Sequence, residues 1–242
     1  MSLHANNSLL SLIGNTPMLR LRSFDTGLCE LYVKLELQNP GGSIKDRIAL
    51  SIIEEAEVSG DLLPGGTIIE ATAGNTGIGL ALVAALKGYR IILVVPDKMS
   101  REKIYHLEGL GAEVVLTRSD VPEGHPEYYQ DVARAIAAET KDSFLADQFS
   151  NPNNPAAHRV STGPEIWQQM DGKVDAVVVG VGSGGTVTGL AEFFQNKNNQ
   201  VQMVVADPEG SIVADAVTKG SYFYEGGSWL VEGIGEDFIP DN

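Results

Sequence analysis

TIIEATAGNTGIGLALVAAL, residues 67–86, joins a strand-like run to a helix-like run through a glycine-rich loop. Thr67–Ala71 is short, apolar and β-branched, which is typical of a buried strand. Residues 72–77 supply glycine, hydroxyl and amide groups, and Ile78–Leu86 predicts a helix that Gly88 closes. A strand that runs through such a loop into a helix is the repeating unit of a parallel sheet.

The same alternation continues on the C-terminal side of this segment. Ser100 is placed to cap the helix 101–110, and Gly111 ends it. The pattern predicts further strands at 90–95, 112–116, 144–147, 174–179 and 201–206, and further helices at 126–139, 155–170 and 186–194. Apolar strands separated by single helices predict an α/β fold with parallel pairing, in which ligands bind at the carboxyl ends of the strands.

Composition excludes several classes of function. The 242 residues carry a formal charge of −15, which repels nucleic acid and anionic membranes, so any phosphate must be held by a local site. We expect no membrane span, no secretory signal and no disulfide, which indicates a cytoplasmic protein. The histidines lack metal-ligand spacing and predict no metal site, and we expect Cys29 to be a small buried residue.

The loop GVGSGGT, residues 180–186, follows a strand and opens a helix. Its backbone N–H groups and the helix N-terminus predict a phosphate cradle. Two alternatives remain. In the first, the loop is only a tight packing turn. In the second, the protein is an NAD-dependent dehydrogenase, whose dinucleotide fingerprint would consist of Gly180, Gly182 and Gly185, with Asp207 after the next strand.

Two further loops carry candidate chemistry. PGGSIKDR, residues 40–47, puts Lys45 between the strand-like run 30–37 and the expected helix 48–58, and we expect the nearby Arg47 to disfavour its ammonium form. In TAGNTG, residues 72–77, the helix start can bind a carboxylate and Asn75 can donate to a phenolate oxygen. The alternatives are a solvated surface lysine and an ordinary helix cap.

PGGSIKDR, TAGNTGIGLA and GVGSGGTVTG, in this order, resemble the fold-type II pyridoxal-phosphate (PLP) enzymes: cysteine synthase, cystathionine β-synthase and their relatives. GNTP near the start, DQFSNP at 147–152 and VEGIG at 231–235 extend the resemblance along the whole chain. The resemblance implies a homodimer of two three-layer α/β lobes with mostly parallel sheets, as in tryptophan synthase β. It assigns residues 46–152 to a smaller mobile lobe, and 1–45 plus 153–242 to a larger PLP-binding lobe that is incomplete at its C-terminal end.

The resemblance also implies roles for single residues. Lys45 forms the Schiff base with PLP and moves the α-proton, and Asn75 bonds the ring hydroxyl oxygen. The phosphate is expected on Gly182, Ser183, Gly184, Gly185 and Thr186. The amino-acid substrate is expected on Thr72, Ala73, Gly74, Thr76 and Gln148, with Gly233 near the cofactor on the substrate side.

The implied reaction is a β-replacement on serine, O-acetylserine or cysteine by a thiol. LELQNPGGSIKDR and VEGIGEDFIP resemble cystathionine β-synthase, which implies homocysteine as acceptor; cysteine synthase, with sulfide, is the alternative. Ala73 stands where the family usually has serine, and Glu236 where animal β-synthases have an aromatic residue. The family continues past residue 242 with the partner of the pyridine nitrogen. A PLP-free, inactive partner protein is a further alternative.

Overall fold

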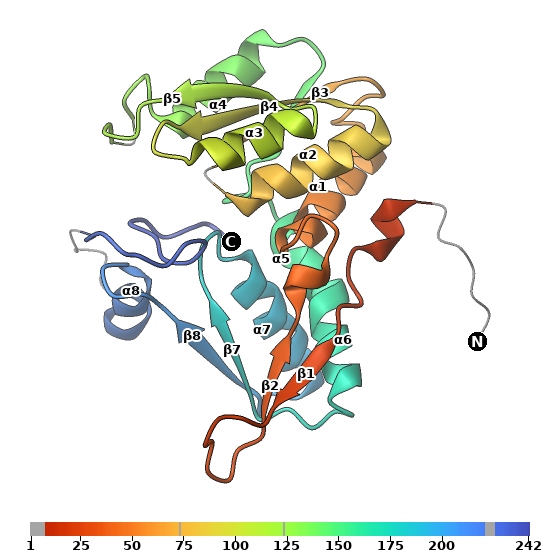
Figure 1. Cartoon of the computed structure of the whole chain (residues 1–242), viewed down its shortest axis with the longest axis vertical. Coiled ribbons are helices and arrows are strands. Elements are labelled where there is room, and N and C mark those ends of the chain that lie inside the picture. Colours follow the sequence, from red (N-terminus) through yellow and green to blue (C-terminus); the bar gives the residue numbers. More distant parts are fainter. Residues whose placement is uncertain (1–7, 73, 123, 221–225) are drawn as a thin grey trace. The chain divides into compact units, whose positions relative to one another are not determined.

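The computed structural model describes residues 8–72, 74–122, 124–220 and 226–242. Its contacts divide the chain into two compact units, residues 1–147 and 148–242, which are described separately (Figure 1). The expected assignment of 1–45 to the same lobe as 153–242 stays a prediction.

The first unit is built on a four-stranded parallel sheet with strand order β5-β4-β3-β6. Its strands are β3 (Thr67–Ala71), β4 (Arg90–Pro96), β5 (Glu113–Thr117) and β6 (Ser143–Leu145). They alternate with α2 (Asn75–Lys87), α3 (Arg101–Gly109) and α4 (Tyr129–Glu139). As predicted, Ser100 caps α3 by accepting from the N–H of Lys103 at 3.4 Å, and Gly88 ends α2 in the left-handed conformation. The predicted α/β fold with parallel strands is confirmed.

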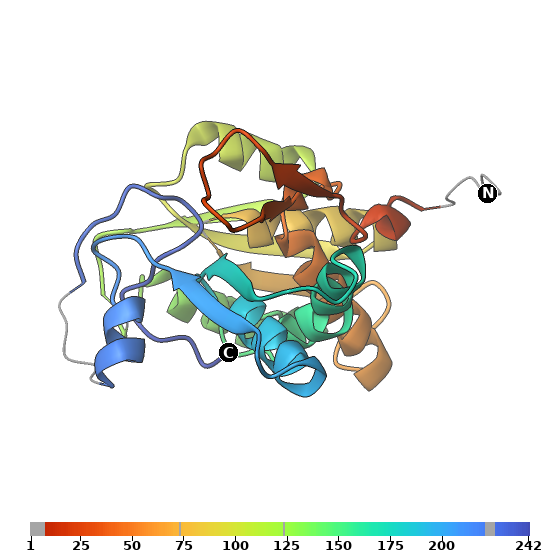
Figure 2. The same ribbon diagram turned by 90° about the horizontal axis from the view of Figure 1, so that it is seen from below.

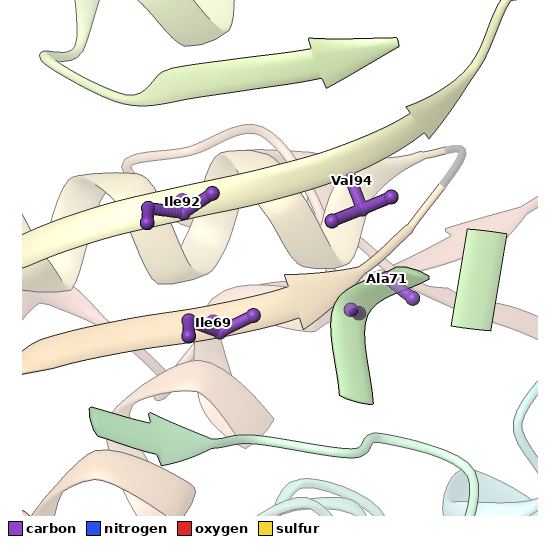
Figure 3. Packing of buried hydrophobic residues seen from close by; sticks show 5 residues of the cluster. Ile69, Ala71, Ile92 and Val94 are labelled. Carbon is purple, nitrogen blue, oxygen red and sulfur yellow. The ribbon is translucent and has the colours of Figure 1, made fainter. Parts of the chain in front are cut away.

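Both faces of this sheet are covered. Ile69, Ala71, Ile92 and Val94 project from β3 and β4 on one face, where Ala133 of α4 completes a buried cluster (Figure 3). On the opposite face, α2 contacts both strands, and α1 (Lys45–Ser59) and α3 pack against α2. Helices on both faces exclude water from the strands, which is why β4 is apolar from Ile91 to Val95 and β3 is buried throughout, including Thr67 and Glu70.

The segment before α1 departs from the prediction. The expected strand 30–37 is shorter, because β2 (Leu31–Lys34) gives way to the 3₁₀-helix η2 (Glu36–Gln38). β2 pairs in antiparallel fashion with β1 (Met18–Leu21), and the 3₁₀-helix η1 (Leu9–Leu12) precedes β1; neither was predicted. α1 begins at Lys45 and α2 at Asn75, so each helix starts three residues earlier than predicted.

The second unit contains two parallel strands, β7 (Ala176–Gly180) and β8 (Gln202–Ala206), joined through α7 (Gly185–Lys197). Both views show α7 lying along this strand pair, with α8 (Val213–Lys219) beyond the end of β8 (Figure 2). The strand–loop–helix connection from β7 to α7 is the predicted glycine loop. α8 was not predicted.

The expected helix 155–170 is present as one continuous helical stretch over 153–169, in which a π-helical turn separates two α-helical parts. α5 (Asn153–Ala157) is followed by a π-helical turn, η3 (His158–Thr162), and by α6 (Gly163–Gln169). Pro164 has no N–H to donate to residue 160, and the N–H of Gly163 bonds the carbonyl of His158 instead. All three segments pack around α7.

Two further observations concern compartment and surface. No helix in the described ranges has the length and apolar character that crossing a membrane requires. The expectation that Cys29 is buried is wrong: it is exposed, in the connection between β1 and β2, where few side chains surround it.

Candidate active site

Lys45 is the first residue of α1, directly after the turn 39–44. Its N–H donates to Ser43 Oγ at 3.1 Å, which satisfies one of the donors that a helix start leaves unpaired. The N–H of Gly42 bonds the carbonyl of Asn39 at 2.8 Å, and Gly42 has a φ of 83°, a conformation that favours glycine. The sequence GGSIK therefore folds as a tight turn that presents a lysine at a helix N-terminus.

A buried ion pair anchors this turn. Arg47 is 4% exposed, and its guanidinium makes two bonds to Glu36, Nε to Oε2 at 2.7 Å and Nη2 to Oε1 at 2.8 Å. Burial raises the pKa of Glu36, but Arg47, with Thr16 and Asn39, outweighs burial and holds the pKa below its ordinary value. The expectation that Arg47 disfavours the ammonium form of Lys45 in a desolvated site stays a prediction; the structure shows that Arg47 is itself paired with Glu36.

Asp46 ties the beginning of the turn to the helix. Its carboxylate is fully buried and accepts from the N–H of Gly41 at 2.5 Å. A Cβ on residue 41 would overlap this carboxylate, so the sequence needs glycine there. Burial raises the pKa of Asp46, and the nearby negative charge of Glu36 raises it further.

The asparagine loop runs from the end of β3 into α2. The N–H of Thr72 bonds the carbonyl of Val94 at 3.0 Å, and Thr72 Oγ1 accepts from the N–H of Gly74 at 3.2 Å. Gly74 is the N-cap and has no side chain to cap the helix, so the alternative that Asn75 or Thr76 caps α2 is wrong. Asn75 is exposed, and its amide has no partner in the described part of the chain.

α1 and α2 bring these two loops together. A Cβ built on Gly79, one turn after Asn75, lies 3.0 Å from the carbonyl oxygen of Lys45 and 3.2 Å from Cβ of Ala49. We call Lys45, Thr72, Gly74, Asn75 and Thr76 the lysine cluster. Ala73, also a candidate substrate residue, lies outside the described residues.

The loop after β7 has the donors that a phosphate needs. The N–H groups of Gly184, Gly185, Thr186 and Val187 have no acceptor among the described residues, and α7 has no side-chain cap. Four unpaired donors at the N-terminus of a 13-residue helix form an anion site. The residues present therefore fit the phosphate group of PLP.

Packing explains the glycines of this loop. A Cβ on Gly180 would overlap Ile234, one on Gly184 would overlap the carbonyl of Asn242, and one on Gly185 would overlap the carboxamide of Asn154. The packing interpretation and the phosphate interpretation of this loop are therefore compatible. Close packing of Ile234, Asn242 and Asn154 requires the glycines, and the N–H groups still have no acceptor among the described residues.

Gln148 and Gly233 lie beside this loop. The carbonyl of Gly233 is 3.2 Å from a Cβ built on Gly182, and the N–H of Gly235 bonds the carbonyl of Val181 at 2.7 Å. Gln148 is 6% exposed and is linked to Ser183 through Asn154. We call Gln148, residues 182–186 and Gly233 the phosphate cluster.

Several residues that support these clusters escaped the sequence interpretation. Asn154 and His158 are fully buried; His158 lies 3.2 Å from Thr186 Oγ1 through Nε2 and 3.0 Å from Thr162 Oγ1 through Nδ1. Asp207, the acidic residue of the dinucleotide interpretation, uses Oδ2 to accept from the N–H of Ala214 at 2.8 Å in the first turn of α8. A buried polar residue has no local sequence signal when its partner is about 30 positions away.

Comparison with known proteins identifies the family of this chain. The family model "Pyridoxal-phosphate dependent enzyme" matches residues 9–242. Cystathionine β-synthase of Rattus norvegicus is 50% identical over 235 residues, which cover 96% of this chain and 42% of the rat protein. Cysteine synthase 3 of Caenorhabditis elegans is 43% identical over 95% of this chain and 66% of that protein. The chain thus spans less than half the length of the rat relative.

A solved structure shows the same fold. The O-acetylserine dependent cystathionine β-synthase of Helicobacter pylori aligns with a TM-score of 0.87 and 37% identity, over 98% of this chain and 75% of that one. The predicted fold-type II architecture is confirmed by this likeness. The family match also decides against a dehydrogenase, since PLP and not NAD is the cofactor of this family. The chain belongs to the pyridoxal-phosphate dependent enzymes.

Proposed function

We propose that this protein catalyses a β-replacement, in which a thiol takes the place of the β-substituent of serine or an activated serine. The family match over residues 9–242, with 50% identity to a cystathionine β-synthase, carries this proposal. The two clusters support it, because each offers groups that one part of PLP and its substrate require.

The cofactor, when bound, supplies an electron sink for the α-carbon of the amino acid. Lys45 would hold the cofactor covalently; once the amino group of the substrate has displaced it, its free amine would accept and return the α-proton at Nζ. The free N–H groups at the start of α7 bind the phosphate, and Thr186 adds a hydroxyl. The exposed amide of Asn75 donates to the ring hydroxyl oxygen.

The substrate carboxylate is assigned to the start of α2. Thr72, Gly74 and Thr76 surround a helix N-terminus whose N-cap offers no side chain, and an anion is stabilised there. Ala73 and Gln148 complete the substrate residues, and Gly233 is assigned to the substrate side, near the cofactor. These assignments explain why the loop is rich in hydroxyl and amide groups.

For the acceptor we propose homocysteine, which makes cystathionine the product. The sequences LELQNPGGSIKDR and VEGIGEDFIP and the rat relative support this choice. Cysteine synthase is the second candidate, favoured by the Caenorhabditis relative. In steady-state assays with both acceptors present, kcat/KM for homocysteine should exceed that for sulfide; a preference for sulfide with O-acetylserine would make the protein a cysteine synthase. We also propose a homodimer, which sedimentation analysis tests.

Ala73 is expected to influence which donor the enzyme prefers, serine or a donor with a better leaving group. A serine hydroxyl at this position helps protonate the departing oxygen, and such a hydrogen bond is worth about 1–3 kcal/mol in a dry site. Without it, O-acetylserine or cysteine should be favoured over serine, and the O-acetylserine dependent relative from Helicobacter pylori supports an activated donor. In Ala73→Ser, the ratio of kcat/KM for serine to that for O-acetylserine should rise about tenfold. An unchanged ratio would make Ala73 a packing variant.

A further inference from the structure

Asn154 is a fully buried amide that the proposed roles leave unused. It is the second residue of α5, and its main-chain N–H bonds the carbonyl of Asn151 at 3.0 Å. Its Nδ2 donates to the carbonyl of Gln148 at 2.7 Å and to Ser183 Oγ at 2.9 Å. One carboxamide therefore bonds the segment that carries a substrate residue and the loop that carries the phosphate donors.

The two acceptors fix the orientation of this side chain. A flipped amide would point its oxygen at the carbonyl oxygen of Gln148, which offers no proton, so only the observed orientation satisfies that acceptor. The remaining oxygen, Oδ1, is buried and has no donor among the described residues. Leaving such an acceptor unpaired is costly, and an apolar side chain of similar size would avoid the cost. Packing alone therefore does not account for an asparagine at this position.

The phosphate loop is built directly on this carboxamide. The three nearest atoms to a Cβ on Gly185 are all from the Asn154 side chain, and Oδ1 is the nearest. Gly185 is one of the residues whose N–H is unpaired. A shift of Asn154 thus moves the first turn of α7, where the phosphate donors lie.

Gln148 is held at the other end of the same amide. Its carbonyl accepts from Asn154 and also from Nδ2 of Asn242 at 2.6 Å, so both lone pairs are used. The preceding residue, Asp147, has a φ of 46°, a left-handed conformation that Asp adopts more readily than most residues. The two amide donors thus fix the carbonyl that directly follows this turn.

We propose that Asn154 is a positioning residue that couples the phosphate loop to the substrate residue Gln148, an inference that rests on the proposed function of the phosphate cluster. It touches neither cofactor nor substrate in this assignment. Its loss should weaken cofactor retention and amino-acid binding together, while kcat with saturating cofactor changes little.

The test uses Asn154→Leu, which removes both donors at similar volume, with Asn154→Asp as a second variant. Asn196→Asp is the matched control, because Asn196 is an exposed residue of the same unit whose amide donates to the carbonyl of Glu192 and to no other described residue. We expect the PLP dissociation constant and the KM for the amino-acid donor each to rise about tenfold in the Asn154 variants. Asn196→Asp should change neither quantity.

A double-mutant cycle separates positioning from general damage. In Ser183→Ala the hydrogen bond from Asn154 to the loop is already absent. Adding Asn154→Leu to this variant should therefore weaken PLP binding by less than about threefold, but it should still raise the KM for the amino-acid donor. Additive losses in PLP affinity, or a lower melting temperature with unchanged PLP dissociation constant and KM, would overturn the proposal.

A readout without cofactor distinguishes this inference from the proposed function. In the cofactor-free protein, hydrogen exchange at Thr188, whose N–H bonds the carbonyl of Gly184 at 3.1 Å in the first turn of α7, should be faster in Asn154→Leu than in wild type and in Asn196→Asp. If wild type takes up no PLP, the proposed function fails, while unchanged exchange in Asn154→Leu would refute the role of Asn154 in either case. If the Asn154 variants are too unstable to purify, Ser183→Ala is measured in their place: exchange at Thr188 should again be faster than in wild type, because the bond from Asn154 to the loop is lost, and an unchanged rate would refute the role of Asn154.

Discussion

Glu36 and Arg47 show how two side chains fix the turn that carries Lys45. The Arg47 side chain is 2% exposed and that of Glu36 is 16% exposed, so neither charge is well solvated without the other. Thr16 Oγ1 bonds Glu36 at 2.6 Å and Asn39 Nδ2 bonds Glu36 at 2.9 Å, which completes the shell of the carboxylate. The network links the GNTP segment, η2 and α1, because Thr16, Asn39 and Arg47 all bond the carboxylate of Glu36.

Removing one partner of this pair should destabilise the protein strongly. Glu36→Gln leaves the buried Arg47 charge uncompensated, and we expect it to lower the free energy of unfolding at pH 7 by about 3 kcal/mol. Because the folded pKa of Glu36 lies below the ordinary value of 4.5, its contribution is present above that value and is lost as the pH falls through the folded pKa. The difference between wild type and variant should therefore shrink in acid.

Denaturant titrations at neutral and acidic pH measure this difference. Glu113→Gln is the control, because Glu113 and Arg90 form an exposed pair at 3.8 Å, and its loss should cost less than about 1 kcal/mol. Equal losses in the two variants, or a pH-independent loss in Glu36→Gln, would contradict the buried-pair account.

At the scale of elements, the packing of α1 on α2 places Lys45 near the asparagine loop. Gly79 permits this approach, since a Cβ there would press on the Lys45 carbonyl and on Ala49. Neither atom lies at the end of a flexible side chain, so a backbone must move to accept a larger residue. The helix–helix contact is thus part of the site as well as of the core.

Gly79→Ala should separate the two helices. We expect a loss of about 1–3 kcal/mol from overpacking, together with weaker PLP retention. Gly109→Ala is the matched control: residue 109 is also helical, nothing lies within 4 Å of its built Cβ, and the change should be neutral or stabilising by about 0.5–1 kcal/mol. Thermal unfolding and PLP titration of both variants measure the contrast. A Gly79→Ala protein as stable as the control would show that the contact is loose.

The sequence predicted the order of most elements because buried parallel strands and capped helices have local signals. β3, β4 and α3 are examples, each with apolar or capping residues at the expected positions. It failed where distant contacts decide the local structure. The π-helical turn at 158–162 needs the packing against α7, and the starts of α1 and α2 depend on the turn bonds of Ser43 and Thr72.

At the scale of the whole molecule, the net charge is negative although the proposed ligand carries a negatively charged phosphate. A net charge of −15 repels a phosphorylated cofactor at long range, so binding relies on short-range donors. The free N–H groups at the start of α7 satisfy this requirement with no lysine or arginine in the loop 182–186. The motifs predicted these loops as ligand sites, but the supporting network of Asn154 has no motif, because its bonds to Ser183 and Gln148 are properties of the folded chain.

The covalent attachment of PLP to Lys45 is the central claim, and chemical trapping tests it most directly. Reduction of the holoenzyme with borohydride, followed by proteolysis and mass spectrometry of the peptides, should find the pyridoxyl group on Lys45. In Lys45→Ala the same treatment should leave every peptide unlabelled. A pyridoxyl group on Lys34 or Lys87, or label that persists in Lys45→Ala, would contradict the assignment of this lysine and the account of the site built around it.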